Sequence, residues 1–384
     1  MVTRPFSCTW ILDSGGAGRG AWQGGVLYEV MRWTRTNGGY PTIAMGASAG
    51  GYAAADVATG SEATVLKGWT VWGAPEIPKR YPLADFVANE WPRSRFRKHL
   101  HASIRYVMEP PEVDDVFDES AQRTLLVFTS RIRRLDGRTP GRADLTKLFA
   151  MAATRKLPGR LKYRPRYQVD PVVFATNLPD ALQSECVRPL TRANYHCAIE
   201  ASCLVPLAMG PAIQPTLLSP GGLFPNDRQA IFVDGGFALK MPMAIFEDDA
   251  RFRGLARWTA TPRTVVFCCD PNGRLWETSL RLRALNDHPS VARALADGTL
   301  LVIHPDHVVE AGFLCFDPVV IMRTFERGRE QGRRLLAAPH IRRFLSGTDG
   351  HTEPASPLEP PRRSPDSSAS VPDDVAVRQS PRSS

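Results

Sequence analysis

Short apolar runs that end in glycine alternate with a longer helical pattern at the start of the chain. The run from Phe6 to Asp13 predicts a strand, and Thr42 to Met45 predicts a second, short buried strand. Between them, a set of apolar residues recurs at helical spacing along one face: Trp22, Val26, Leu27, Val30 and Trp33. This order of strand, helix and strand predicts an α/β fold.

The same pattern continues through the rest of the chain. Further apolar runs predict strands over Thr124–Ser130, Pro171–Thr176, Ala230–Val233, Arg263–Cys269 and Thr299–His304. Helices are predicted over Tyr195–Ala201 and Pro318–Leu336. We therefore expect one α/β domain over residues 1–346, with a mostly parallel sheet flanked by helices. The segment after it is rich in proline and serine, so a disordered tail is predicted over residues 347–384.

Composition narrows the class of protein. Of the 384 residues, 43% are hydrophobic, which is enough for a full core. No apolar run approaches the roughly 18 residues of a membrane-spanning helix, and the first ten residues do not have the pattern of a signal peptide. The seven cysteines form no C-x-x-C pair. We expect a cytoplasmic protein, peripheral at membranes if it meets them, with no metal site and no cofactor.

Positive charge is concentrated in one part of the chain. The net charge is +9, and residues 131–166 contain twelve lysines or arginines but only two acids, Asp136 and Asp144. Such a stretch would attract phosphates of anionic phospholipid or nucleic acid, and is equally typical of a solvated, arginine-rich face. No nucleic-acid-binding motif accompanies it, so a nucleic acid partner is not expected. The sequence leaves the oligomeric state open.

Aromatic and basic residues are mixed between positions 60 and 111. We expect irregular helical segments there, which would suit a lid over a site. The aromatic residues favour burial in the core over insertion into a lipid interface. They are Trp69, Trp72, Phe86, Trp91 and Phe96.

A glycine-rich loop, Ser14 to Gly20, joins the first predicted strand to the first helix. This arrangement directs backbone N–H groups and the positive end of a helix dipole at one point, which suits a phosphate or a transient oxyanion. A Walker loop is excluded, because Gly20 is not followed by Lys and Ser or Thr. A dinucleotide fingerprint fits the glycine spacing, but the acidic residue expected about 20 positions on is missing between Thr36 and Tyr40.

The sequence Gly46-Ala47-Ser48-Ala49-Gly50 comes directly after the second predicted strand. A serine held at a sharp strand-to-helix corner projects its hydroxyl above the sheet, where it can act as a nucleophile. The motif alone is weak, so partners are needed. One candidate is Asp234, which ends a predicted strand and precedes Gly235 and Gly236, although Asp-Gly-Gly is also an ordinary turn sequence.

Loop, serine corner and Asp-Gly-Gly, in this order, resemble the patatin-like phospholipases. That family carries an N-terminal S-G-G-G-x-R-G loop, then G-x-S-x-G, then D-G-G or D-G-A far downstream. Smaller marks agree, including Ala201-Ser202 and Pro206 before the aspartate and Pro242 after it. Ala17 stands where the family has its third glycine, and we expect Gly18 to absorb the turn there.

The resemblance implies a serine acyl hydrolase acting on lipid esters, with a patatin-like three-layer α/β/α fold. Ser48 would be the nucleophile and Asp234 its general base, a dyad without histidine. Backbone N–H groups of Gly15, Gly16 and Ala17 would form the oxyanion hole. The remaining motif residues would shape these segments: Gly18, Arg19, Gly20, Gly46, Gly50, Gly235 and Gly236. The partner would be a lipid or membrane surface, with anionic phospholipid among the candidates.

Two other functions fit part of the pattern. An α/β-hydrolase triad would have the order Ser48, Asp234 and then His288, His304 or His307. A non-catalytic lipid-binding module would use the same fold and the basic stretch. Acyl transfer to an acceptor other than water would use the same dyad, and the sequence leaves head group, acyl position and chain length open.

Overall fold

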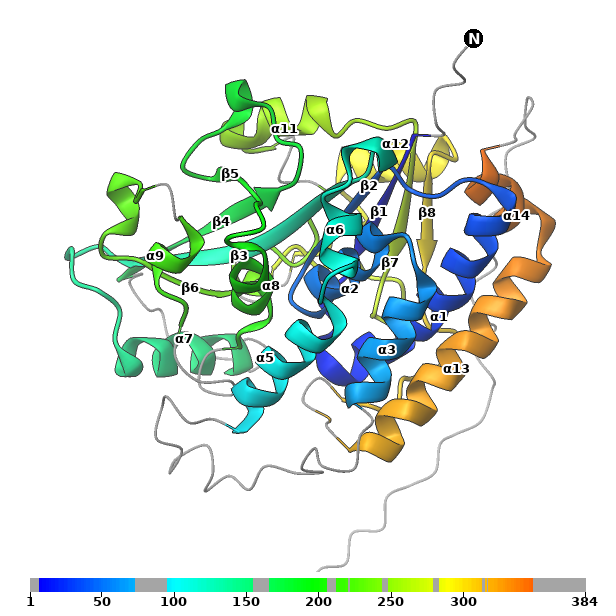
Figure 1. Cartoon of the computed structure of the whole chain (residues 1–384), viewed down its shortest axis with the longest axis horizontal. Coiled ribbons are helices and arrows are strands. Elements are labelled where there is room, and N and C mark those ends of the chain that lie inside the picture. The colour runs from blue at the N-terminus through cyan, green and yellow to red at the C-terminus, as the bar shows by residue number, and fades with distance from the viewer. Residues whose placement is uncertain are drawn as a thin grey trace, which may run out of the picture. The chain divides into compact units, whose positions relative to one another are not determined.

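An eight-stranded mixed sheet forms the centre of the protein (Figure 1). The computed structural model describes residues 7–72, 95–154, 166–205, 212–219, 222–243, 248–278, 283–312, 315 and 317–347. The strands are β1 (Cys8–Leu12), β2 (Ile43–Ala47), β3 (Thr124–Arg134), β4 (Tyr167–Ala175), β5 (Val187–Pro189), β6 (Ile231–Asp234), β7 (Arg263–Phe267) and β8 (Leu300–Ile303). Their order is β5-β4-β3-β2-β1-β7-β8, with β6 paired to β3 beside this path.

Most neighbouring strands are parallel. β1 pairs in parallel with β2 and β7, β2 with β3, β4 with β5, and β7 with β8. β3 is antiparallel to both β4 and β6. The structure therefore confirms an α/β fold with a mostly parallel mixed sheet flanked by helices.

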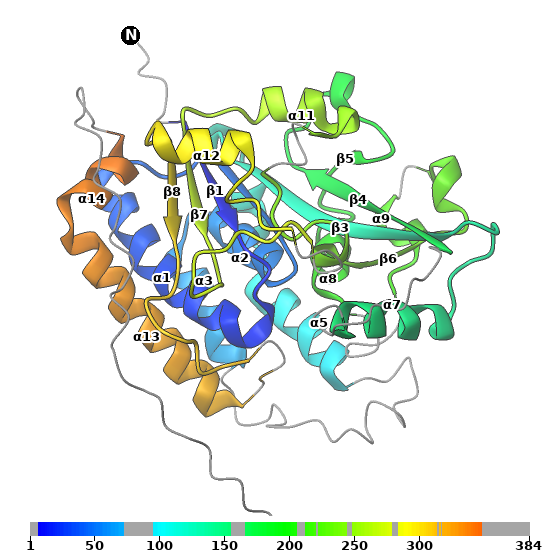
Figure 2. The same cartoon turned by 180° about the vertical axis from the view of Figure 1, so that it is seen from behind.

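Helices cover both faces of this sheet (Figures 1 and 2). They are α1 (Gly16–Asn37), α2 (Ala49–Thr59), α3 (Glu62–Trp72), α5 (Arg95–Val107), α6 (Glu112–Val116), α7 (Arg142–Thr154), α8 (Tyr195–Cys203), α9 (Pro215–Leu218), α11 (Arg253–Trp258), α12 (Pro289–Ala296), α13 (Pro318–Ala337) and α14 (Pro339–Ser346). No helix in these described ranges is both long enough and apolar enough to cross a membrane.

The two faces of the sheet have separate apolar cores, because successive strand residues point to opposite sides. On one face, Trp10 and Leu12 of β1 pack with α1, α2, α3, α8 and α13. On the other face, Ile11 packs in a cluster that includes Leu255 of α11 and Val291 of α12. Because both faces of the sheet are covered, β1 and β2 are buried along their whole length and are mostly apolar.

α13 lies along α1, so the end of the described chain covers its beginning (Figures 1 and 2). The two backbones approach closely: a Cβ at Gly25 would lie 2.0 Å from the carbonyl oxygen of Phe325, and one at Gly328 would lie 2.1 Å from that of Trp22. Trp22 also donates its indole N–H to Gln331 Oε1 at 2.9 Å. This contact buries the apolar stripe predicted on the first helix, including Trp22, Val26 and Val30.

The elements predicted from apolar runs are confirmed. β1, β2, β6, β7 and β8 lie within one or two residues of the predicted bounds, whereas β3 and β4 extend four residues beyond them. Within residues 60–111, Trp69 and Trp72 are buried core residues, as expected. Phe86 and Trp91, the side chain of Phe96, and the predicted tail apart from Gly347 lie outside the described residues. The strand β5 and the helices α6, α7, α9, α11, α12 and α14 were not predicted.

Three arginines at the start of the basic stretch of residues 131–166 form ion pairs with acids. Arg131 is buried and pairs with Asp170 and Asp227, at 3.5 and 3.2 Å. Arg133 pairs with Asp170 at 3.2 Å, and Arg134 pairs with Asp136 and Asp144. Acidic side chains therefore compensate the charge of these three arginines, and the attraction of the stretch to phosphates stays a prediction.

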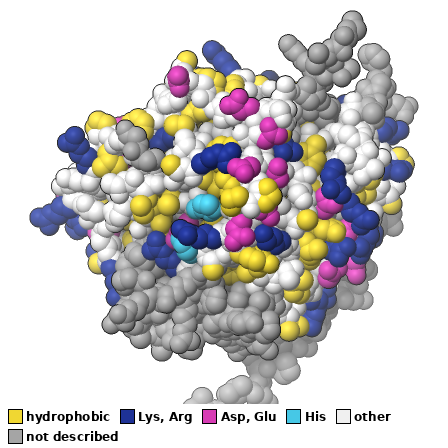
Figure 3. Space-filling model, in the orientation of Figure 1, with side chains coloured by type: hydrophobic (Ala, Val, Ile, Leu, Met, Phe, Trp, Pro, Cys, Tyr) yellow, Lys and Arg dark blue, Asp and Glu magenta, His cyan; other side chains and the backbone are white. Residues whose placement is uncertain are grey.

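One face of the described surface is mixed in charge. On the face that Figure 3 shows, lysine and arginine side chains lie interspersed with aspartate and glutamate side chains. Ion pairs account for part of this mixture, for example Arg35 with Glu62 at 2.7 Å and Arg329 with Glu326 at 3.1 Å.

Candidate active site

Ser48 lies at the corner between β2 and α2, with a strained backbone. Its φ of 58° and ψ of −133° are unusual for a residue with a side chain, and such strain costs about 1–3 kcal/mol. The strand ends at Ala47 and the helix begins at Ala49, so Ser48 is the single residue between them. This is the geometry that the Gly46–Gly50 motif predicted.

Close backbone contacts explain the two glycines of the motif. A Cβ at Gly46 would lie 2.3 Å from the carbonyl oxygen of Gly50, and one at Gly50 would lie 2.1 Å from that of Leu12. A side chain at Gly46 would push the start of α2 away from β2, and one at Gly50 would push α2 away from the end of β1. The glycines are needed for packing, while the positive φ falls on Ser48 itself.

The end of α8 clamps the backbone of Ser48. Ser202 Oγ accepts the Ser48 N–H at 2.9 Å and donates to the Phe128 carbonyl at 2.7 Å. The Cys203 thiol donates to the Ser48 carbonyl at 3.1 Å. Ser202 thereby links the corner to β3 and holds the strained conformation in place.

Asp234 reaches the same place from the opposite direction. β2 runs parallel to the first half of β3 and ends with Ala47 opposite Phe128. β6 runs antiparallel to the second half of β3 and ends with Asp234 opposite Thr129. The two strands therefore end head to head at adjacent positions of β3, and the carboxyl of Asp234 interacts with the hydroxyl of Ser48.

The Asp234 carboxyl is buried and has few partners. Its Oδ1 accepts the Gly236 N–H at 2.8 Å, and Oδ2 has no hydrogen bond of ordinary geometry from the described residues. Burial raises the pKa of Asp234 to about 6, although interactions with the Ser48 hydroxyl and the Gly236 N–H both lower it. A carboxylate with one uncommitted oxygen beside a serine hydroxyl is suited to accept that proton.

Gly235 allows this approach. A Cβ there would lie 2.1 Å from the Phe128 carbonyl oxygen and 3.0 Å from the Ala47 Cβ. Ser130 reinforces the turn, because its hydroxyl donates to the Asp234 carbonyl at 2.7 Å and accepts the Ala238 N–H at 2.9 Å.

The glycine loop lies beside the serine corner. Leu12, at the end of β1, pairs with Gly46. Gly20, near the start of α1, approaches the corner so closely that a Cβ there would lie 3.3 Å from the Cβ of Ala49. Gly15 is the N-cap of α1 and Gly16 is its first residue. The first N–H groups of a helix lack intrahelical partners, so this end of α1 offers free donors and a positive dipole near Ser48.

The turn of this loop falls on a different glycine from the one expected. Gly16 has a φ of 68°, whereas Ala17 and Gly18 lie inside α1. A Cβ at Gly18 would lie 2.2 Å from the Gly312 carbonyl oxygen, so Gly18 serves a close approach and does not absorb the turn. The left-handed position is thus occupied by a glycine, and alanine at position 17 meets a helical backbone. The Arg19 side chain is exposed.

The histidines considered for a triad have other partners. His288 contacts Asp248 and Ser290, His304 contacts the Pro305 carbonyl, and His307 contacts Asp306. Within the described ranges, no hydrogen bond or ion pair joins a histidine to Ser48 or Asp234.

Two charged residues of the site were missed from the sequence. Asp13, directly before the glycine loop, is buried and forms an ion pair with Lys240 at 3.3 Å. Lys240 lies six residues after Asp234. The signal available was the position of Asp13 at a strand end, the same signal that singled out Asp234. Sequence spacing alone does not show that the two residues meet.

No set of three or more histidine, cysteine, aspartate or glutamate side chains is arranged to hold a metal ion in the part of the chain that the structure describes. The chain matches no protein-family model, and no curated protein matches it. An inference about its function therefore rests on the geometry of the site and on the resemblance of its motifs.

Proposed function

We propose that this protein is a serine acyl hydrolase that cleaves fatty-acyl esters of lipids through Ser48 and Asp234. The observation that carries the proposal is the meeting of β2 and β6 on β3, which sets a strained serine against a buried carboxyl of raised pKa. A strained serine or a buried carboxyl, taken separately, can have a purely structural role. Their coincidence with the end of a glycine loop favours a catalytic site.

In the first half of the reaction, Ser48 Oγ attacks the ester carbonyl carbon and Asp234 Oδ2 takes the hydroxyl proton. Negative charge then develops on the carbonyl oxygen. Backbone N–H groups of Gly15, Gly16 and Ala17 would stabilise it, and one such donor contributes about 3–4 kcal/mol in comparable sites. The tetrahedral intermediate collapses, the lipid alcohol leaves with the proton from Asp234, and the acyl group stays on Ser48.

In the second half, water attacks the acyl-enzyme. Asp234 takes a proton from the water, the same N–H groups meet the new oxyanion, and the fatty acid leaves as Ser48 regains its proton. An alcohol in place of water would give acyl transfer through the same steps. No histidine is required in either half.

The substrate class rests on the resemblance of the motifs to the patatin-like phospholipases, together with the three-layer α/β/α arrangement implied by that likeness. Helices on both faces of the sheet are consistent with it. The proposed substrates are phospholipids presented at a membrane surface, with anionic phospholipid among them.

The direct test is release of fatty acid and lysolipid from phospholipid vesicles with and without phosphatidylglycerol. We expect Ser48→Ala and Asp234→Asn each to lower the rate by about a thousandfold or more. Ser120→Ala, at an exposed serine, is the matched control and should keep the wild-type rate. Equal release by the wild type and Ser48→Ala would contradict the proposal, as would no release from any vesicle.

The same assay distinguishes a Ser-Asp dyad from a Ser-Asp-His triad. We expect His288→Ala, His304→Ala and His307→Ala each to keep activity within about threefold, because their side chains contact other residues. A loss of several hundredfold in one of them would favour a histidine-dependent hydrolase.

A further inference from the structure

An ion pair with a buried carboxylate joins the residue before the glycine loop to the segment after Asp234. Asp13 ends the segment before the loop and is only 1% exposed. Lys240 Nζ lies 3.3 Å from Asp13 Oδ1 and 3.5 Å from Oδ2. The Cys269 N–H, beyond the end of β7, donates to Oδ2 at 2.9 Å. One carboxylate therefore connects three segments that are distant in sequence.

The backbone on both sides of this pair is fixed. The Asp13 N–H donates to the Phe267 carbonyl at 3.1 Å, and Gln23 donates to the same carbonyl at 2.8 Å. Lys240 donates its own N–H to the Glu277 carbonyl at 2.7 Å. Between Asp234 and Lys240 the chain folds back on itself, since the Leu239 N–H donates to the Gly235 carbonyl at 2.9 Å.

Stability alone does not account for such a pair. Removing two charges from water costs free energy that their attraction often fails to recover, and an apolar pair of similar size is frequently as stable. A role in placing the loops, or in controlling the charge near them, is a better reason for it.

The negative charge of Asp13 lies close enough to the glycine loop to affect groups that contact it. Burial chiefly, and then the Asp13 carboxylate, raise the pKa of the Cys269 thiol. Cys269 packs against Gly15, where a Cβ would lie 2.5 Å from its Sγ. An unpaired carboxylate at position 13 would oppose the negative charge that the proposed reaction develops at this loop. Lys240 is the cation positioned to cancel it.

We infer that Lys240 is a positioning residue, which through its ion pair with Asp13 fixes the glycine loop beside Ser48 and keeps negative charge away from the oxyanion. The inference rests on the proposed function. Lys240 does not touch the reacting atoms; it acts through Asp13 on the N–H groups of the loop. Its loss is therefore expected to change kcat and to leave KM nearly unchanged.

The test compares steady-state hydrolysis of phospholipid vesicles by the full chain and four variants. Lys240→Met should lower kcat by about 10- to 100-fold with KM within about twofold. Lys240→Arg should keep kcat within about threefold, because it retains the charge. In Asp13→Asn/Lys240→Met the uncompensated carboxylate is gone, so kcat should recover at least about threefold over Lys240→Met.

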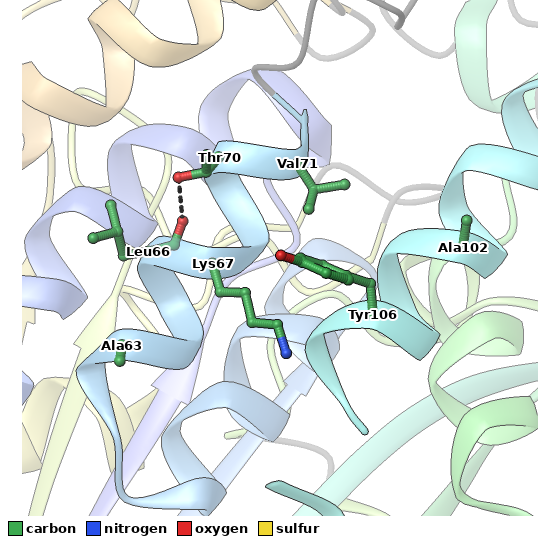
Figure 4. A pocket seen from close by; sticks show the side chains of 7 residues that line it. All are labelled: Ala63, Leu66, Lys67, Thr70, Val71, Ala102 and Tyr106. Carbon is green, nitrogen blue, oxygen red and sulfur yellow. Dashed lines mark hydrogen bonds between the residues drawn. The ribbon is translucent and has the colours of Figure 1, made fainter. Parts of the chain in front are cut away.

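Lys67→Met is the matched control. Lys67 also forms an ion pair with a carboxylate, Glu112, at 3.1 Å, and it lies in an open groove of about 720 Å³ between α3 and α5 (Figure 4). This variant should keep kcat within about twofold.

Three results would overturn the inference: an unchanged kcat in Lys240→Met, a rise in KM alone, or an equal loss of kcat in Lys67→Met. Failure of the proposed function looks different, because the wild type itself would then release no fatty acid, or Ser48→Ala would release as much.

Discussion

Asp234 combines two opposing properties, burial and a need for charge. Burial favours the neutral acid, while the Ser48 hydroxyl and the Gly236 N–H favour the carboxylate, and the result is a pKa raised to about 6. A base with this pKa is mostly ionised at pH 7 and still close enough to neutrality to accept a proton. The residue is therefore poised for general base catalysis without a histidine.

This value gives a pH dependence. Because only the carboxylate accepts the proton, kcat/KM should be constant above about pH 7, halve near pH 6 and fall about tenfold per unit below it. The measurement is the initial rate of hydrolysis of a soluble acyl ester between about pH 4.5 and 8.5, over a range in which the protein stays folded. A rate that stays constant down to the acid end of that range would contradict the role of Asp234.

Asp56 shows the cost of burying a carboxyl without partners. It is completely buried in α2, and neither oxygen has a hydrogen-bond partner among the described residues. Burial raises its pKa well above the usual range. The folded state thus binds the proton more tightly than the unfolded state, so this stabilisation exists at low pH and is lost as the pH rises above about 4.

Asp56→Leu should therefore increase the free energy of unfolding at about pH 7.5 by about 1–3 kcal/mol, and by less at about pH 4. Asp227→Leu is the matched control: Asp227 is equally buried but pairs with Arg131 and Arg188, so its loss should destabilise by about 3–5 kcal/mol. Urea unfolding measures both. A less stable Asp56→Leu at the higher pH would show that the carboxyl has a partner that stabilises it.

The residues predicted from sequence are those that a local pattern marks. Ser48 and the glycines around it stand at a predicted strand end, and Asp234 stands at another. Asp13 and Lys240 carry no such pattern as a pair, because their contact depends on the path of the chain between positions 234 and 240. From the sequence we expect Gly18 to absorb the turn of the glycine loop, but the positive φ falls on Gly16. The spacing of the glycines fits either position, so the sequence does not distinguish them.

At the scale of the element, the C-terminal end of α8 supports the serine corner. Its last residues, Ser202 and Cys203, bind the N–H and the carbonyl of Ser48 and keep the backbone of that residue strained. The sequence marks Ala201-Ser202 by resemblance only, since a helix end gives no indication of what it will touch. The contacts of this helix with β3 and the serine corner show what it supports.

Ser202→Ala tests that support. It removes the partner of the Ser48 N–H and of the Phe128 carbonyl, so we expect a loss of about 1–3 kcal/mol in stability and at least about a tenfold loss in kcat. The control is Ser103→Ala, a buried serine whose hydroxyl donates to the Leu100 carbonyl in its own helix. Both variants are assayed at a temperature where they remain folded; equal kcat values for the two would contradict the clamp.

The strands that the sequence predicts correctly are buried apolar runs with clear ends. β1 and β2 are examples, because the fold buries both of their faces and leaves little ambiguity. α7 and α14 were missed because each offers only a short apolar stripe, which includes the buried residues Leu145 and Leu148 in α7 and Ile341 and Leu345 in α14. The antiparallel pairing of β6 was not predicted either, because four residues contain no information about their partner.

At the scale of the whole molecule, the site depends on one strand that changes partners along its length. β3 pairs with β2 over its first half and with β6 over its second half. The change of partner falls between Phe128 and Thr129, beside Ser48 and Asp234. The sequence predicts each strand but not this topology, which determines that the two side chains meet.

The two ends of the described chain also pack against each other. α13 packs along α1, which carries the glycine loop at its first turn, so the last long helix supports the first functional segment (Figure 2). α1 thereby connects the loop to α13, while the ion pair of Asp13 and Lys240 connects the residue before the loop to the segment after Asp234.

The most direct test of the dyad is covalent labelling of the intact chain with a fluorophosphonate, analysed by mass spectrometry. We expect one adduct on wild-type protein, located on Ser48, formed at a rate that falls as the pH drops through about 6 and that Asp234→Asn lowers by at least about a hundredfold. Ser48→Ala should remain unlabelled. Labelling at another residue, or equal rates in wild type and Asp234→Asn, would contradict the account.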